Sequence, residues 1–196
     1  MSKPILFCDF DGTICHQLYW RSLPQDKYEK VQNILFRRDT TKVKSWMRGE
    51  YAAEEINVFL SEAIGVPFEE LWQIFEEDCK TMEVSQSTLE KLASLRARFI
   101  VMLTTSNMDS FTRYTQPALK LDTYFDYISN SYFEKKLKTD NGGELFIEYA
   151  KKYNVPIDEC IVLDDSKAVC ESFKALGGTA YLVTPQIGVD YYLDRI

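Results

Sequence analysis

The sequence predicts an α/β protein with a doubly wound parallel sheet and an inserted α-helical segment. Along residues 85–196, short apolar runs alternate with amphipathic stretches of helical periodicity, as parallel strands and crossover helices do. Residues 17–84 carry helical periodicity and no strand pattern. Because a crossover needs only about a dozen residues, we expect a core formed by residues 1–16 and 85–196 and a helical cap formed by residues 17–84.

The first strand is predicted in the apolar run that begins at Pro4 and ends in an acidic turn containing Asp9, Asp11 and Gly12. A short buried strand that feeds a tight turn projects its following carboxylates beyond the edge of the sheet. In open α/β sheets, ligands bind in the crevice outside the carboxyl ends of the strands. The acidic turn is therefore the first candidate for a functional site.

The insert contains three amphipathic stretches with apolar residues at a spacing of three to four, at residues 25–37, 52–64 and 68–79. Its aromatic side chains, which include all three tryptophans of the chain, are first of all core material for a small helical bundle. Trp20 and Trp46 have a second interpretation, in which they face a ligand.

The core pattern resumes with a helix at residues 87–96 and an unbroken apolar strand at residues 99–103, which leads to Ser106 and Asn107. Further strands are predicted at residues 125–128, 160–163 and 180–183, with helices at residues 144–153 and 167–176. A basic stretch that contains Lys138 follows the third strand, and Asp164 and Asp165 follow the fourth.

Polar side chains thus follow several strands of one parallel sheet, whose carboxyl ends point the same way. Three carboxylates gathered at one place repel one another, and a hard cation relieves that repulsion. Mg²⁺ suits such an oxygen-rich cluster, because it binds a few carboxylate or carbonyl oxygens while water and phosphate complete its shell. We therefore expect these groups to meet in one crevice that binds Mg²⁺.

The element Asp9-Phe10-Asp11-Gly12-Thr13 resembles the nucleophile loop of the haloacid dehalogenase-like hydrolase superfamily, most of whose members are magnesium-dependent phosphatases. The resemblance covers essentially the whole core, whereas the insert matches the superfamily's caps only in size and helical character. It implies that the side chains of Asp9 and Asp165 bind Mg²⁺ and that Asp11 contributes its backbone carbonyl. Asp164 would lie in the first or the second coordination shell.

The resemblance also implies a division of chemical roles. Asp9 would attack phosphorus to form an aspartyl-phosphate, which divides one difficult hydrolysis into two easier steps. Asp11 would protonate the leaving oxygen and then deprotonate the attacking water, which requires a raised pKa. Gly12 would let backbone N–H groups approach a phosphoryl oxygen. Three side chains would bind the other phosphoryl oxygens: Ser106, Asn107 and Lys138.

The phosphate-binding lysine is where the chain departs from the family pattern. Relatives commonly carry a Lys-Pro-Asp element, whereas this chain has Lys138-Thr139-Asp140 and a longer loop before the next helix. We expect Lys138 to be the phosphate lysine, with Lys135 and Lys136 as alternatives.

Substrate contacts from the cap are expected in two places. Residues 46–50 resemble the loop by which the superfamily's helical caps reach over the active site. Arg48 in this loop either contacts a substrate anion or is solvated ahead of the next helix. Tyr19, Trp20 and Arg21, just past the acidic turn, are further candidates.

These residues predict a phosphatase that hydrolyses a small phosphorylated metabolite under a closing cap. A phosphomutase of the same superfamily is the nearest alternative, because the same residues can pass the phosphoryl group to a second hydroxyl. A dehalogenase is disfavoured by the presence of Asp11, the acid that a phosphoryl leaving group needs. The third class is a non-catalytic binding protein that retains the fold.

Composition narrows the partners and the compartment. The net charge of −7 over 196 residues argues against nucleic acid or an anionic membrane as the main partner. Residues 1–4 lead into the first strand without the apolar stretch of a signal peptide, and no run is long enough to span a bilayer, so we expect a cytoplasmic protein. Five cysteines without a C-x-x-C pair predict neither a disulfide framework nor a zinc site.

Overall fold

A five-stranded sheet of parallel strands forms the centre of the computed structural model, which describes residues 3–196. The first two residues of the expected core segment lie outside the described chain. The strand order is β3-β2-β1-β4-β5. The strands are β1 (Ile5–Cys8), β2 (Ile100–Thr105), β3 (Tyr127–Asn130), β4 (Ile161–Asp164) and β5 (Thr179–Leu182). The order reverses between β1 and β4, so the predicted doubly wound α/β class is confirmed.

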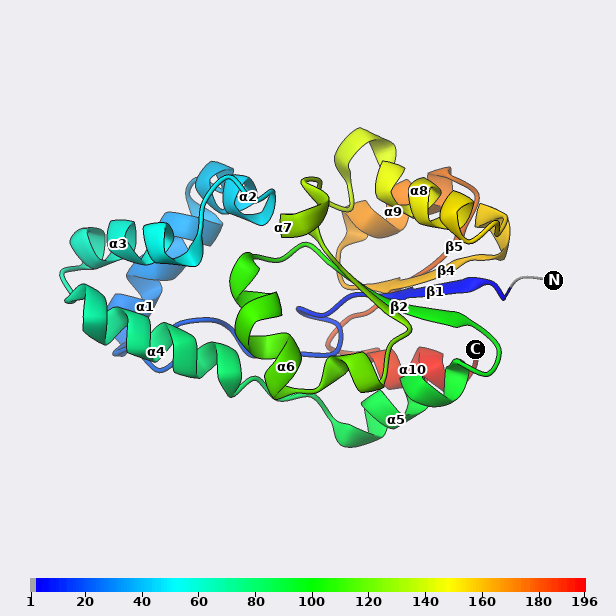
Figure 1. Cartoon of the computed structure of the whole chain (residues 1–196), viewed down its shortest axis with the longest axis horizontal. Helices are drawn as coiled ribbons and strands as arrows, with labels where there is room; N and C mark the ends of the chain where they lie inside the picture. The colour runs from blue at the N-terminus through cyan, green and yellow to red at the C-terminus, as the bar shows by residue number, and fades with distance from the viewer. Residues whose placement is uncertain (1–2) are drawn as a thin grey trace.

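Helices cover both faces of this sheet (Figure 1). They are α5 (Gln86–Leu95), α8 (Glu144–Lys152), α9 (Lys167–Ala175) and α10 (Val189–Leu193). Ile5 and Phe7 of β1 pack in one cluster with side chains of α8 and α9, whereas Leu6 and Cys8 belong to a second cluster with α5 and α10. Successive side chains of a strand point to opposite faces, so a strand covered on both sides is apolar throughout.

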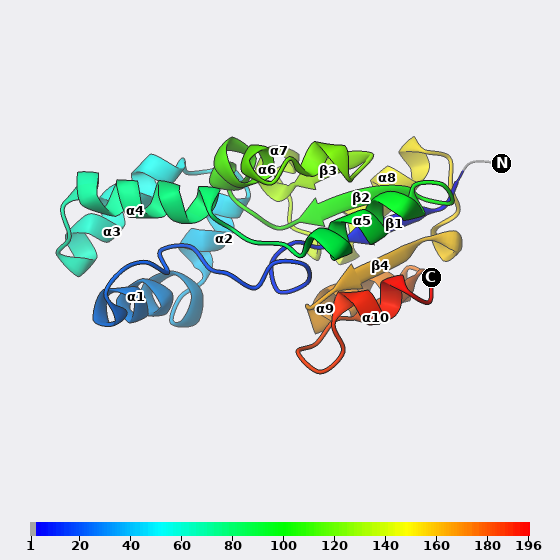
Figure 2. The same ribbon diagram turned by 90° about the horizontal axis from the view of Figure 1, so that it is seen from below.

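A second group of helices lies at the end of the molecule opposite the amino terminus, and the carboxyl ends of the strands point toward it (Figures 1 and 2). The group consists of α1 (Gln25–Gln32), the π-helical segment η1 (Asn33–Arg37), α2 (Thr41–Met47), α3 (Ala53–Ile64) and α4 (Phe68–Lys80). The helices predicted at 52–64 and 68–79 match α3 and α4, and the stretch at 25–37 matches α1 and η1.

Two parts of this segment differ from the expectation. Residues 17–24 are irregular rather than helical, and Trp20 among them has a φ of 59°. Helix α2 lies between the individually predicted helices, and its last two residues fall within the loop expected at residues 46–50. It was missed because only Val43 and Trp46 are buried in it, which is too short a repeat to show helical periodicity.

The second group of helices shares its hydrophobic core with the sheet. One continuous cluster of buried side chains includes Leu6 and Leu103 of the sheet together with Trp20, Trp46 and Phe75 of the insert. The rings of Trp20 and Phe75 stack with their centroids 4.6 Å apart. The insert is therefore packed onto the sheet as one apolar body, rather than attached only through its two connections.

A buried carboxylate reinforces this junction. Asp109, which follows β2, accepts hydrogen bonds from the Trp46 indole N–H at 2.7 Å and from the backbone N–H of Ala53 at 3.3 Å. It also pairs with Arg113 at 3.0 Å, and the same guanidinium contacts Glu54 of α3 at 2.6 Å. These contacts join α2 and α3 to the segment after β2.

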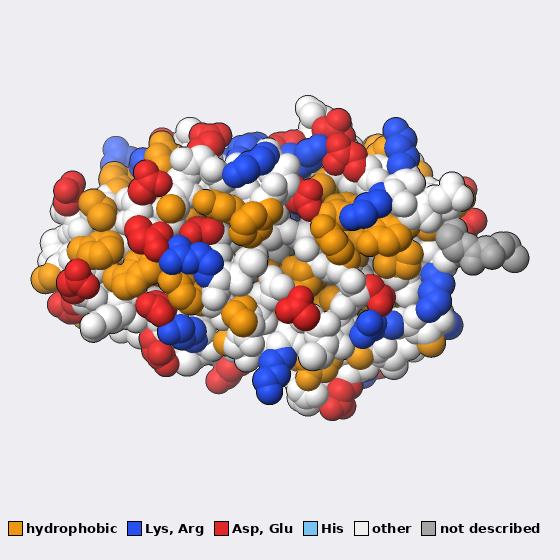
Figure 3. Space-filling model, viewed as in Figure 1, with side chains coloured by type: hydrophobic (Ala, Val, Ile, Leu, Met, Phe, Trp, Pro, Cys, Tyr) orange, Lys and Arg blue, Asp and Glu red, His pale blue; other side chains and the backbone are white. Residues whose placement is uncertain are grey.

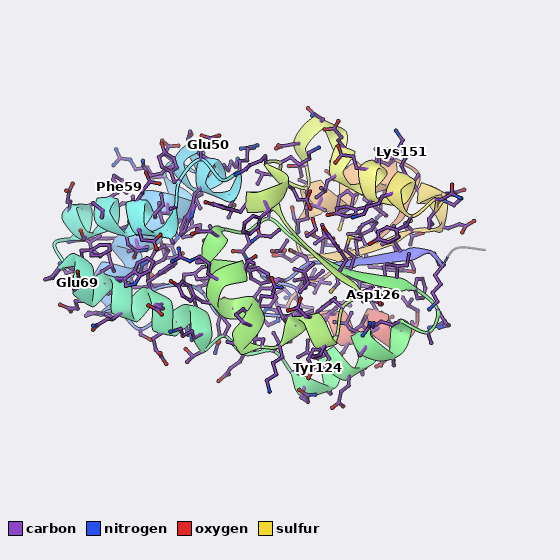
Figure 4. The ribbon with its side chains drawn as sticks, viewed as in Figure 1. Glu50, Phe59, Glu69, Tyr124, Asp126 and Lys151 are labelled. Carbon is purple, nitrogen blue, oxygen red and sulfur yellow. The ribbon has the colours of Figure 1, made fainter. Side chains whose placement is uncertain are left out.

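Short helical turns complete the connections between strands. They are the π-helical segment η2 (Phe111–Thr115), α6 (Gln116–Ala118), η3 (Leu121–Thr123), α7 (Ser131–Glu134), η4 (Asp140–Gly142) and η5 (Ile157–Glu159). Asp126, labelled in Figure 4, accepts hydrogen bonds from the Val101 N–H at 2.9 Å and from Arg96 at 2.8 Å. This carboxylate thereby ties the start of β2 to the chain entering β3.

Acidic and basic side chains are interspersed over the face in Figure 3, with apolar side chains between them. The five cysteines are all buried and unpaired. No helix within residues 3–196 has the length and apolar character needed to cross a membrane.

Candidate active site

The acidic residues meet where the strand order reverses. Cys8, the last residue of β1, is paired with Leu163 of β4, and the backbone N–H of Asp9 continues the ladder by donating to the Leu163 carbonyl at 2.9 Å. Asp9 therefore lies beside Asp164, the last residue of β4. This is the crevice in which doubly wound sheets bind ligands.

The chain after Asp9 folds into a tight turn. The Phe10 carbonyl accepts hydrogen bonds from Ile14 N–H and Cys15 N–H, both at 3.0 Å, and Gly12 N–H donates to Cys15 at 2.8 Å. Gly12 has a φ of +74°, and a Cβ at this position would lie 2.2 Å from a carboxylate oxygen of Asp165. Only glycine permits this backbone conformation and this close approach together.

Lys138 lies between two of the carboxylates. Its ammonium is 2.7 Å from Asp9 Oδ1 and 2.6 Å from Asp164 Oδ2, and all three side chains are at most 8% exposed. Burial disfavours the charged ammonium, but the two carboxylates outweigh this and raise the pKa of Lys138 above its usual value. The lysine is therefore a fixed positive charge beside Asp9.

Asp11 lies in a different environment. Its Oδ2 accepts a hydrogen bond from the Asn107 amide at 2.7 Å, and the Asn107 carbonyl oxygen accepts one from the Tyr19 hydroxyl at 2.8 Å. Its Oδ1 is shielded from solvent and has no hydrogen-bond partner among the described residues. Burial, with a contribution from Asp165 and opposed by Lys138, raises the pKa of Asp11 to about 7. Near neutral pH, this carboxyl can therefore both give and take a proton.

Three of the acids could hold a metal ion. Asp9, Asp164 and Asp165 each offer a carboxylate oxygen, and these atoms lie within 4.8 Å of one another. One ammonium against three carboxylates leaves the cluster negative, and all the donors are hard oxygens. This donor set fits Mg²⁺ and does not fit metals that prefer sulfur or imidazole ligands.

Ser106 and Asn107 come from the end of β2. Ser106 lines the same cavity as the acids, and its Oγ accepts a hydrogen bond from the Lys138 backbone N–H at 3.4 Å. Asn107 is fully buried, and its backbone N–H donates to the Ser131 hydroxyl at 3.0 Å. Asn107 therefore holds Asp11 from a position that is itself fixed by the strand ends.

These groups open into a cavity of about 450 Å³ between the sheet edge and the insert. Among the candidates from the sequence, Asp9, Asp11, Gly12, Tyr19, Ser106, Lys138, Asp164 and Asp165 line it. Asn107 lies directly behind Asp11 and Tyr19.

Four candidate ligand contacts do not line this cavity, contrary to expectation: Trp20, Arg21, Trp46 and Arg48. Arg21 donates to the backbone carbonyls of Asp78 and Thr81 at 2.7 and 2.9 Å, and the Trp46 indole donates to Asp109. Trp20 is fully buried in the core of the insert, where its indole N–H donates to Asn57 at 3.0 Å. Arg48 forms two hydrogen bonds to Asp140, at 2.9 and 2.7 Å, and does not line the cavity. Each side chain is satisfied by a residue distant in sequence, which periodicity and spacing do not reveal.

The alternative lysines are also engaged elsewhere. Lys135 reaches the backbone carbonyl of Gly49 at 3.2 Å, and Lys136 pairs with Glu148 at 2.6 Å. Of the three lysines in this stretch, only Lys138 contacts the acids.

Several cavity residues were not singled out from the sequence. Gln32 and Phe36 lie in a stretch read only as an amphipathic helix, and Leu18 and Met47 stand next to candidates without being chosen. No sequence signal distinguishes a helix residue that faces a cavity from one that faces solvent or core. Their role in lining the cavity depends on how the insert packs.

The fold and the site together define a doubly wound α/β protein with an acidic, lysine-paired crevice at its switch point. A family model of haloacid dehalogenase-like hydrolases matches residues 4–177, and the chain belongs to that family. A search of curated proteins found no significant match.

Solved structures resemble the whole chain. A HAD family enzyme from Bacteroides thetaiotaomicron, solved as its magnesium complex, has a TM-score of 0.75 at 21% identity, with 100% of each chain covered. The same enzyme with magnesium and inorganic phosphate has a TM-score of 0.69 at 18% identity, covering 93% of this chain and 95% of that one. A 2-haloacid dehalogenase from Pseudomonas syringae has a TM-score of 0.64 at 13% identity, covering 94% and 87%. At these identities, the likeness shows the fold.

Proposed function

We propose that the protein is a Mg²⁺-dependent phosphatase that hydrolyses a small phosphate monoester through an aspartyl-phosphate on Asp9. The observation that carries this proposal is the contrast between two carboxyls separated by one residue. Burial raises the pKa of both carboxyls above the ordinary aspartate value, but their partners differ. Asp9 is paired with the Lys138 ammonium at 2.7 Å, whereas Asp11 accepts a hydrogen bond from the neutral Asn107 amide and has one oxygen without a partner among the described residues. Two acids in opposed environments are the usual basis for assigning a nucleophile and an acid–base group.

Asp9 supplies the nucleophilic oxygen. Its carboxylate lines the cavity at the point where the strand order reverses. The Lys138 ammonium offsets the repulsion between this carboxylate and an incoming phosphate. The new bond forms between an Asp9 oxygen and phosphorus, and the bond from phosphorus to the substrate's bridging oxygen breaks. Water then hydrolyses the acyl phosphate, which releases inorganic phosphate and restores Asp9.

Asp11 moves the protons. In its protonated form it donates to the bridging oxygen as that oxygen leaves, and as a carboxylate it accepts a proton from the attacking water. The Asn107 amide holds one oxygen of Asp11, and the other, Oδ1, has no hydrogen-bond partner among the described residues. The raised pKa of Asp11 allows both forms to be populated near neutral pH.

Binding of the phosphoryl group falls to the remaining groups at the strand ends. Ser106 and Lys138 line the cavity and offer a hydroxyl and an ammonium, and Gly12 exposes its backbone in the tight turn. Asp9, Asp164 and Asp165 would hold Mg²⁺, which when bound supplies positive charge for the phosphoryl oxygens. The Bacteroides thetaiotaomicron enzyme was solved with magnesium and inorganic phosphate, which supports this choice of ion and ligand.

The cap assignment belongs to the same proposal. We propose that residues 17–84 form the cap over a core of residues 1–16 and 85–196. The insert provides Leu18, Tyr19, Gln32, Phe36 and Met47 to the cavity wall that faces the acids. It would exclude water during the reaction and select the substrate.

Dehalogenases among the similar structures suggest a second chemistry. A halide leaves without a proton, so a dehalogenase has no use for a buried acid beside its nucleophile. An alkoxide leaving group does need one. Asp11 and its hydrogen bond from Asn107 therefore favour phosphate ester hydrolysis.

The proposal is tested by Mg²⁺-dependent release of phosphate from an aryl phosphate such as p-nitrophenyl phosphate. We expect activity in the wild type and a loss of at least about a thousandfold in Asp9→Asn, because the nucleophile is removed. Asp158→Asn, at an exposed position, is the matched control and should retain activity. Undiminished phosphate release in Asp9→Asn, or chloride release from chloropropionate without phosphate release, would overturn the proposal.

A further inference from the structure

The two walls of the cavity differ in charge. The wall at the sheet edge carries the acids and Lys138, as described above. The facing wall, from the insert, contributes no charged side chain among the described residues. Together with neighbouring core residues, it forms a mostly apolar lining composed of Leu18, Phe36, Met47, Met108, Leu137 and Val169.

Gln32 is the one polar side chain of the insert that remains available in this lining. Tyr19 also lines the cavity, but its hydroxyl is used by Asn107. Gln32 is only 7% exposed, lines the cavity, and makes no side-chain hydrogen bond to any residue of the described chain 3–196. Its amide atoms are not among the buried side-chain atoms that lack a hydrogen-bond partner, so they are accessible from the cavity. A ligand group in the cavity can therefore form a hydrogen bond to this amide.

The backbone at this position is also unusual. Gln32 ends α1, and the chain continues directly as the π-helical segment η1, which contributes Phe36 to the same cavity. The widened turn is closed by a hydrogen bond from Arg38 N–H to the Asn33 carbonyl at 3.0 Å. π-Helical turns inside α-helices occur frequently at functional sites. Here the π-helical turn directly follows Gln32 and contains Phe36, and both of these residues line the cavity.

The cations Arg48 and Lys135 lie near the insert wall, but neither lines the cavity. The Arg48 guanidinium is bound to Asp140 at 2.9 and 2.7 Å, and the Lys135 ammonium contacts the Gly49 carbonyl at 3.2 Å. Lys138, the one cation among the described lining residues, is held by Asp9 and Asp164. A second anionic group on a ligand would therefore lie against this wall without a counter-charge, which is unfavourable wherever water is excluded.

We infer that the site accepts phosphate monoesters whose organic part is uncharged and mostly apolar, with one hydrogen-bonding group recognised by the Gln32 side-chain amide. This inference rests on the proposed function and names its substrate class. Esters whose organic part bears a carboxylate, a second phosphate or an ammonium are rejected, because the insert wall has no group to pair with that charge. A cavity of about 450 Å³ has room for such a small organic group.

Phosphonates test this class without requiring turnover, because a methylene replaces the bridging oxygen and blocks hydrolysis. Calorimetric titration of the wild-type chain with Mg²⁺ would compare butylphosphonate and hydroxypropylphosphonate with phosphonoacetate and aminoethylphosphonate. We expect the two neutral compounds to bind at least about tenfold more tightly than the two charged ones, because burying an unpaired charge is costly. Equal or tighter binding of a charged phosphonate, or no binding of any compound, would overturn the inference.

The role of Gln32 is tested by Gln32→Leu, with Gln25→Leu as the matched control at an exposed position of the same helix. Across hydroxyalkylphosphonates of increasing chain length, Gln32→Leu should weaken the best binder by roughly threefold to tenfold, the value of one neutral hydrogen bond. Butylphosphonate should bind as in the wild type. Gln32→Arg should improve phosphonoacetate binding by supplying the missing cation. If Gln32→Leu weakens no hydroxyalkylphosphonate more than Gln25→Leu does, Gln32 is not the recognition group.

The two proposals fail in distinguishable ways. Absence of phosphate release with the neutral phosphonates still preferred would refute the phosphatase and leave the ligand class standing. Phosphate release with equal affinity for charged and neutral phosphonates would refute the ligand class alone.

Discussion

Asp9 and Asp11 have the same side chain and are separated by one residue, yet their surroundings differ. Asp9 shares the Lys138 ammonium with Asp164, whereas Asp11 receives a neutral amide from Asn107 and has one oxygen without a partner. The motif alone predicted that both carboxyls lie at the site. Their separate environments arise from side chains of other strand ends, which the motif does not contain.

Gly12 gives the sharpest single-residue prediction. In Gly12→Ala, the added methyl would lie 2.2 Å from an Asp165 carboxylate oxygen in a backbone with φ of +74°. Asp165 must move, so we expect loss of the proposed Mg²⁺ affinity in calorimetry together with loss of the proposed phosphatase activity.

Gly142→Ala is the matched control for this change. Gly142 has a φ of +70°, but a Cβ there meets no atom within 4 Å. Both variants should lose roughly 1–2 kcal/mol of unfolding free energy from backbone strain, and only Gly12→Ala should lose Mg²⁺ binding. Equal effects of both substitutions on Mg²⁺ binding would refute the role assigned to close packing at Gly12.

At the scale of elements, the loop from Lys138 to α8 shows how the chain positions its lysine. The Asp140 carboxylate accepts a hydrogen bond from the Leu137 backbone N–H at 2.9 Å. It also accepts hydrogen bonds from Arg48, the residue that follows α2. One carboxylate therefore closes the loop and joins it to the insert. Arg48 was a candidate for substrate binding, and its pairing with Asp140 instead gives it a place in the scaffold.

This pair predicts a pH dependence of stability. The hydrogen bonds from Arg48, aided by the Leu137 N–H, hold the pKa of Asp140 below its usual value. A lowered pKa in the folded state means that the stabilisation is fully present above the ordinary aspartate pKa, about 4. It is lost as the pH falls through the lowered value.

Chemical unfolding of the wild type and Asp140→Asn at several pH values checks this prediction. Because both partners are partly exposed, the difference in unfolding free energy at neutral pH should be up to about 1 kcal/mol. It should shrink below about pH 4. A difference that grows on acidification would show that the sign is wrong.

At the scale of the whole molecule, the insert and the sheet share one buried cluster and the Asp109 junction. The three tryptophans all lie within the insert, at Trp20, Trp46 and Trp72. Tryptophan fluorescence therefore reports the insert, whereas far-ultraviolet circular dichroism reports all helices and strands.

We expect the two signals to change together during denaturant unfolding, in a single cooperative transition, because the shared core cannot be opened on one side alone. Asp109→Ala should shift both transitions equally, by about 1–3 kcal/mol, because it leaves the buried Trp46 indole N–H and the Ala53 N–H without their acceptor. A fluorescence transition at lower denaturant would show that the insert unfolds independently.

The sequence by itself determined the class of fold and the kinds of residue at the carboxyl edge of the sheet. Strand burial and helix periodicity are local patterns, and parallel strands bring their ends to one side, so the positions of Asp9, Ser106 and Asp164 followed from short stretches. The short helix α2 could not be predicted from periodicity, because its two buried residues are too few to define a helical repeat.

Only the tertiary structure decided what faces the cavity. Gln32 lies within α1, whose sequence pattern marks an apolar face without saying which element covers it. Arg48 and Lys138 are both cations near acids in the sequence, yet one pairs with Asp140 and the other reaches Asp9 and Asp164. Such choices depend on the packing of segments far apart in the chain, because each charge pairs with whichever partner that packing brings within reach.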